Sequence, residues 1–154
     1  VDITERWFAY GKVDLEFDEF ENLDLRATTT VGAGYYFLRK DDHEFRVRGG
    51  LGYQHESFDD GATEDQAIAE LGYDYMFEIT KWLRFNHSLT YYPTFDTLSD
   101  YRLEADTSLL VPLDEDKVWN LKLGMQNEYD SQPVGDTERL DTYWSVNLVV
   151  NPFK

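Results

Sequence analysis

The segment spanning residues 45–54 alternates strictly between two kinds of side chain, and this alternation constrains the fold more than any other feature. Side chains two residues apart lie on the same face of a β-strand. One face of this strand carries Phe45, Val47, Gly49, Leu51 and Tyr53. The other face carries Arg46, Arg48, Gly50, Gly52 and Gln54. In a soluble barrel the apolar face fills the core, whereas in a membrane barrel it faces lipid.

Other segments repeat this period of two along the whole chain. They are residues 7–20, 23–38, 66–79, 82–95, 101–111, 119–129 and 140–151. We therefore predict an all-β protein, an eight-stranded antiparallel up-and-down β-barrel, with residues 1–6 as an N-terminal tail and residues 7–154 as a single domain.

The connections between the predicted strands alternate in length. Short turns near Asp41, Thr80 and Asp114 are expected at one rim, and longer loops near Asp60, Asp96 and Gly135 at the other, including a loop over residues 57–65. A tight turn at Glu21-Asn22 is the one short connection at the long-loop rim. Long loops at one rim and tight turns at the other are typical of outer-membrane barrels.

The aromatic residues favour an orientation with the apolar face outward. An eight-stranded barrel has room inside only for side chains or one small ligand, and the aromatic rings of the apolar face exceed that space. These rings also gather near both ends of the strands, as the two aromatic belts of a membrane protein do. The predicted girdle residues are Trp7, Tyr35, Phe45, Tyr53, Tyr75, Tyr91, Trp119 and Tyr129.

The polar face carries charges of both signs, which supports the same orientation. Charged groups can be enclosed when they pair with one another. The predicted interior network consists of Lys12, Asp14, Arg26, Arg46, Arg48, Glu70, Asp74, Arg84, Arg102, Glu104, Lys122 and Glu128. The alternative is that these charges form a solvated outer face. His87 and Asn127 are polar exceptions on the apolar face.

The composition disfavours several classes of function. A net charge of −17 disfavours nucleic-acid binding, because phosphate contacts need lysine and arginine. The chain has no cysteine, which excludes disulfide and zinc–thiolate frameworks. It also lacks an apolar run long enough for a transmembrane helix, which leaves a transmembrane barrel open.

Neither catalysis nor a bound cofactor is expected. The three histidines are His43, His55 and His87, and no cluster of partners surrounds them in the sequence. His87 and Ser88 are neighbours on a strand, so their side chains point to opposite faces. The acidic loops offer oxygen ligands that suit Ca²⁺, although a solvated turn is the favoured interpretation of each. Their residues are Asp59, Asp60, Glu64, Asp65, Asp96, Asp100, Asp114, Glu115 and Asp116.

Two stretches carry a resemblance to a known family. They are GGLGYQHES over residues 49–57 and LSDYRLEADTSLLVPL over residues 98–113. With them, the last two-thirds of the chain resembles the family of salt-induced bacterial outer-membrane proteins, to which no activity is assigned. The first third resembles that family only in its strand pattern. The resemblance implies a β-barrel located in the bacterial outer membrane.

We therefore expect a small barrel in contact with outer-membrane lipid, its lumen plugged by the charge network, with a structural or interaction role. The first alternative is an extracellular or cell-surface module that assembles with itself into homo-oligomers or fibres through its apolar girdle or by strand addition. The second alternative is a soluble barrel that binds an apolar ligand, which requires the apolar face inside.

Overall fold

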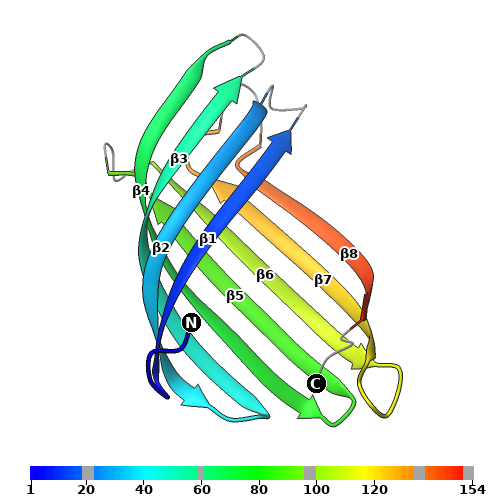
Figure 1. Cartoon of the computed structure of the whole chain (residues 1–154). Coiled ribbons are helices and arrows are strands. Elements are labelled where there is room, and N and C mark those ends of the chain that lie inside the picture. The colour runs from blue at the N-terminus through cyan, green and yellow to red at the C-terminus, as the bar shows by residue number, and fades with distance from the viewer. Residues whose placement is uncertain (19–22, 59–60, 96–99, 134–137, 151–154) are drawn as a thin grey trace.

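The computed structural model describes residues 1–18, 23–58, 61–95, 100–133 and 138–150. Eight strands in these ranges form one antiparallel sheet, in which each strand pairs with the next along the chain (Figure 1). The strands are β1 (Trp7–Asp18), β2 (Leu23–Arg39), β3 (His43–Phe58), β4 (Thr63–Thr80), β5 (Leu83–Pro93), β6 (Tyr101–Pro112), β7 (Trp119–Asp130) and β8 (Leu140–Val150). The prediction of an all-β, up-and-down sheet is confirmed.

Most strand boundaries lie within a few residues of those predicted from the alternation, but β3 and β4 are longer. The loop predicted over residues 57–65 is wrong at both ends, because Ser57 pairs with Thr63 and His55 pairs with Asp65. The Nδ1 atom of His55 lies 2.7 Å from Oδ1 of Asp65, and this contact stabilises the extension. The turn predicted at Glu21-Asn22 lies outside the described residues. Within the described ranges, no helix is long and apolar enough to span a membrane.

The sheet curls so that β1 lies over the concave sides of β4 and β5. The hydroxyl of Tyr10 donates a hydrogen bond to Oε1 of Glu70 (3.0 Å), and Nζ of Lys12 donates one to the hydroxyl of Tyr92 (2.9 Å). These contacts draw β1 toward the middle of the sheet rather than toward β8. No strand pairing between described residues joins β1 to β8, and the predicted closure into a barrel is not seen. In Figure 1 these two strands diverge toward the lower end of the view.

The two faces of the sheet differ sharply in exposure. Leucines on the convex face are exposed to solvent, Leu51 by 62% and Leu71 by 55%. On the concave face Thr30 and Glu70 are 1% and 0% exposed. The apolar face therefore lies outside and the polar face inside, which is opposite to the orientation that the apolar-ligand alternative requires.

Residues 1–6, predicted as a tail, fold back along the free edge of β1. The ammonium group of Val1 donates to the carbonyl of Ala9 (2.6 Å), and the amide of Ala9 donates to the carbonyl of Val1 (2.9 Å). An ion pair of 2.6 Å between Asp2 and Arg39 holds this segment against β2. The segment thus covers the beginning of the β1 edge.

Candidate functional site

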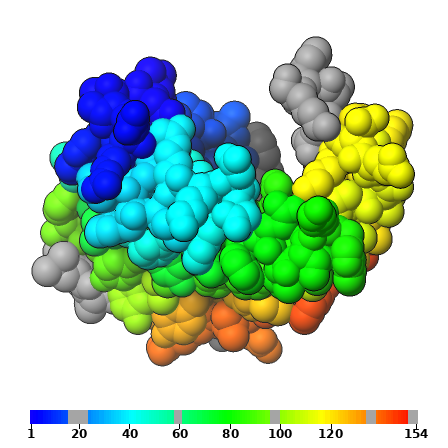
Figure 2. All heavy atoms as spheres, turned by 90° about the horizontal axis from the view of Figure 1, so that it is seen from below, coloured from blue at the N-terminus to red at the C-terminus, as the bar shows by residue number. Residues whose placement is uncertain are grey.

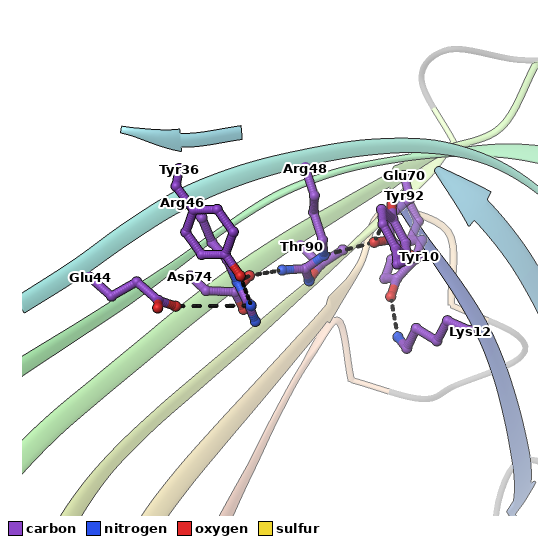
Figure 3. A network of polar contacts seen from close by, with 10 residues as sticks. All are labelled: Tyr10, Lys12, Tyr36, Glu44, Arg46, Arg48, Glu70, Asp74, Thr90 and Tyr92. Carbon is purple, nitrogen blue, oxygen red and sulfur yellow. Dashed lines mark hydrogen bonds and ion pairs between the residues drawn. The ribbon is translucent and has the colours of Figure 1, made fainter. Parts of the chain in front are cut away.

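Arg48 on β3 is the centre of an internal ion network (Figure 3). Its Nε atom lies 2.8 Å from Oε1 of Glu70, and its Nη1 atom lies 2.5 Å from Oδ2 of Asp74, both on β4. Its Nη2 atom donates a hydrogen bond of 2.6 Å to the Thr90 hydroxyl on β5. One guanidinium group therefore connects three neighbouring strands through charge-assisted hydrogen bonds, which are stronger than bonds between neutral groups.

Arg46 continues the network toward the short-turn rim. It lies two residues from Arg48 and therefore on the same face of β3. Its Nε atom is 3.0 Å from Oδ2 of Asp74, and its Nη1 atom donates to the Tyr36 hydroxyl at 3.3 Å. Its guanidinium carbon lies 5.4 Å from the centre of the Phe8 ring, a favourable cation–π distance. Asp74 is thus shared between two arginines.

Two more clusters continue the pairing toward the long-loop rim. The first joins Arg26 on β2 to Glu56 on β3, with Nε and Oε1 2.5 Å apart and both side chains buried. In the second, Arg102 on β6 lies 3.2 Å from Glu104 and 3.5 Å from Glu128. Each cluster pairs opposite charges on adjacent strands.

Three residues of the predicted network lie at its margins. Nζ of Lys122 is 3.8 Å from Asp106, and both of these side chains are partly exposed. Nη2 of Arg84 lies 4.0 Å from Glu78 near the short-turn rim, and no contact among the described residues joins it to Arg48. Asp14 pairs with Lys12 at 2.8 Å, and Nζ of Lys12 donates a hydrogen bond to the Tyr92 hydroxyl. The enclosed part of the network is therefore centred on β2 to β6.

Sequence reasoning missed three tyrosines whose hydroxyl groups bond to the network. The hydroxyl groups of Tyr10, Tyr36 and Tyr92 each bond to a charged side chain of the network. The sequence pattern places these tyrosines on the polar face, because each lies an even number of residues from a predicted charged residue of the same strand. Glu56 was missed because the alternation was followed only to residue 54, and it shares its face with Gln54, which donates to it at 2.7 Å.

The predicted girdle residues lie on the convex face, and most of them contact another ring. Near the short-turn rim, the Trp7 and Tyr35 rings are 5.0 Å apart and the Phe45 and Tyr75 rings 6.4 Å apart. Near the long-loop rim, the Tyr101 ring lies between two girdle residues, 5.4 Å from the Tyr91 ring and 5.9 Å from the Tyr129 ring. The predicted girdle residues Tyr53 and Trp119 are exposed on the same face.

The two polar exceptions on the convex face are both hydrogen-bonded within that face. His87 contacts the Thr107 hydroxyl through Nδ1 (2.9 Å) and the Tyr73 hydroxyl through Nε2 (3.1 Å). The hydroxyl of Thr142 donates to Oδ1 of Asn127 at 2.9 Å. Both ring nitrogens of His87 and Oδ1 of Asn127 therefore have partners within the protein.

The rims carry isolated ion pairs outside the central network. At the short-turn rim, Nζ of Lys117 lies 2.7 Å from Oε1 of Glu78, and this hydrogen bond holds the pKa of Glu78 below its ordinary value. At the long-loop rim, the hydrogen bond from His55 likewise lowers the pKa of Asp65.

The acidic loops are the candidate calcium ligands of the sequence. Among the described residues, no three His, Asp or Glu side chains gather as a metal site needs. Asp59, Asp60 and Asp96 lie outside the part of the chain that the structure describes.

The comparison with protein families identifies one match, which covers nearly the whole chain. The model of the family described as "Protein of unknown function, DUF481" matches residues 1–151. No curated protein and no solved structure matches the chain. The match confirms the resemblance to salt-induced outer-membrane proteins and extends it over the first third of the sequence. The chain belongs to the DUF481 family.

Proposed function

We propose that the chain resides in the bacterial outer membrane, where its convex face contacts lipid and its ion network fills the interior. Its role there is structural or interactive rather than catalytic. Membership of the DUF481 family, linked to outer-membrane proteins, supports the location. The distribution of side chains over the sheet supports the orientation.

The exposed convex face is the observation that carries this proposal. Its middle zone, between the two sets of aromatic rings, exposes aliphatic side chains and no charged one in the described strands. Its most exposed aliphatic members are Val13, Leu15, Val31, Leu51, Leu71, Val146 and Leu148. An apolar surface of this extent is unfavourable in water, at about 25 cal/mol per Å². Contact with lipid removes that cost.

The hydrogen bonds of His87 and Asn127 also support contact with lipid. A polar group in the hydrocarbon region has no water to bond with and must find a protein partner. Both side chains have such a partner on the convex face itself. A solvated face would not need this arrangement.

The concave face suits a plugged interior better than a pore. Contacts from Tyr10 and Lys12 on β1 reach Glu70 and Tyr92 across the concave side, and Arg48 fills the space beside them (Figure 3). The interior is therefore occupied by paired side chains. In lipid the free edges of β1 and β8 need hydrogen-bond partners as well, because every backbone group must be satisfied there.

A charge placed on the convex face tests this function. Leu71→Arg places a cation in the middle of the exposed band of β4, and we expect it to lower the free energy of unfolding from lipid vesicles by about 2–4 kcal/mol. Thr63→Arg is the matched control, because Thr63 is exposed at the rim end of the same strand. We expect its effect to stay within about 0.5 kcal/mol.

Urea titration of both variants in vesicles, read by tryptophan fluorescence, measures the difference. Equal effects of the two substitutions would contradict the proposed contact with lipid. So would a wild-type chain that stays dispersed in buffer without detergent and does not bind vesicles.

A further inference from the structure

The two edges of the sheet are not equivalent. The edge of β1 is covered at its start by residues 1–6, whose amides of Ile3 and Thr4 donate to the carbonyl of Trp7. The outer edge of β8 has no strand beside it among the described residues, although β8 pairs with β7 over its full length, from Leu140 to Val150. Seen from below in Figure 2, the N-terminal part (blue) and the β6–β7 turn (yellow) stand on opposite sides of the molecule.

The side chains of β8 are exposed to solvent on both faces of the sheet, unlike those of the central strands. On its convex face Trp144 is 77% exposed. On its concave face Tyr143 is 54% exposed, whereas Ser108 on the same face of β6 is buried. The curl that brings β1 onto β4 and β5 leaves β8 outside the enclosed interior.

The edge of β8 lacks the features that normally protect an edge strand. Such strands are usually short, bulged, or interrupted by proline or lysine. β8 has 11 residues, no proline and no lysine, and Asp141 is its one charged residue. Its pairing with β7 shows no shift of register. An edge of this kind is a template for another strand.

We infer that β8 pairs with β8 of a second copy of this chain, antiparallel about Ser145. In this register the numbers of two facing residues add up to 290. An even-numbered residue therefore faces an even-numbered one, and an odd-numbered residue faces an odd-numbered one. Trp144 then faces Val146 of the partner copy, Thr142 faces Leu148, and Leu140 faces Val150. Asp141 faces Val149, so no like charges oppose each other.

This pairing joins two copies without any rearrangement of their interiors. The ion network of each copy stays in place, and the apolar convex faces become continuous across the shared pair of strands. The exposed faces of β8 gain cross-strand neighbours, and its backbone groups gain partners. The inference rests on the edge of the sheet and not on the proposed membrane location.

A single cysteine at the centre of the pairing tests the inference. The chain has no cysteine of its own, so Ser145→Cys introduces a unique thiol. Facing residues of an antiparallel pair have Cα atoms about 4.5–5.5 Å apart, within the reach of a disulfide. We expect oxidation to convert most of this variant to a covalent dimer.

Asn147→Cys is the matched control on the same face of β8. Its symmetry mate would lie four residues away along the paired strands, about 13 Å, beyond disulfide reach. We expect at least tenfold less covalent dimer from it. Equal cross-linking of the two variants, or stronger cross-linking at residue 147, would overturn the inference.

The mass of the unmodified chain provides a readout that needs no substitution. Native mass spectrometry or light scattering is expected to give twice the 18.1 kDa of one chain. A monomer would overturn the inference, because closure between β1 and β8 within one chain would produce it. A ladder of larger species would also overturn it, because addition of β8 to β1 of the next copy would produce that ladder. Measurements with and without detergent separate this result from the membrane proposal, since a dimer in buffer alone supports the pairing even when lipid binding fails.

Discussion

At the scale of single residues, the most consequential group is the guanidinium of Arg48. It neutralises Glu70, whose side chain is fully buried, and it shares Asp74 with Arg46. Removing one member of a buried ion pair leaves an uncompensated charge in a place that water does not reach. The free energy of the fold therefore depends more on Arg48 than on the more exposed arginines.

We expect Arg48→Met to lower the free energy of unfolding by about 3–5 kcal/mol, because Glu70 loses its charged partner. Arg84→Met is the matched control. Its side chain is about three times as exposed, at 38% against 14%, and it lies 4.0 Å from Glu78. The control should lose no more than about 1 kcal/mol. Chemical unfolding in detergent measures both, and equal losses would show that the network is not internal.

A pH titration tests the pair formed by Glu78 and Lys117. Lys117 lowers the pKa of Glu78 in the folded state, so the pair stabilises the protein above the unfolded pKa, and this contribution disappears as the pH falls through the lower, folded value. We expect wild type to melt at a higher temperature than Lys117→Gln at pH 7, and the difference to shrink below about pH 4.3, the ordinary pKa of glutamate. A difference that grows on acidification would contradict this sign.

At the scale of strands, the alternation was enough to predict which segments form the sheet. It also predicted which side chains share a face, because parity on a strand decides this. The alternation did not predict the ends of β3 and β4, because residues such as Glu56 and Glu64 lie beyond the apolar band, where both faces are polar. The alternation did not predict the curl of the sheet either, because a period of two does not show how far β1 extends over β4 and β5.

Close approach of β1, β2 and β3 explains one glycine of the concave face. A Cβ atom on Gly32 would lie 2.4 Å from the carbonyl oxygen of Gly49 and 2.7 Å from the Tyr10 ring. We expect Gly32→Ala to lower stability by about 1–3 kcal/mol, as overpacking does. Gly49→Ala is the control, because its new Cβ would first meet a Leu71 methyl group at 3.4 Å. Thermal unfolding of the two variants tests this, and an undisturbed Gly32→Ala would contradict the close packing.

At the scale of the whole molecule, the sheet has one inside-out arrangement, with paired ions on its inner face and aliphatic side chains on its outer face. The candidate network could be predicted in outline from the charges of the polar face. Its hydrogen bonds to tyrosine could not, because the position of a tyrosine on the polar face does not show which charged group its hydroxyl reaches. The sheet edges could not be predicted either, since they depend on the curl.

Fluorescence quenching in lipid bilayers tests this arrangement most directly. Trp144 lies in the exposed band of β8, whereas Trp82 is exposed at the turn between β4 and β5. In single-tryptophan variants, lipids brominated deep in their acyl chains should quench Trp144 strongly and Trp82 weakly. Iodide in the aqueous phase should do the reverse. Quenching of Trp144 by iodide and not by the brominated lipids would contradict the account.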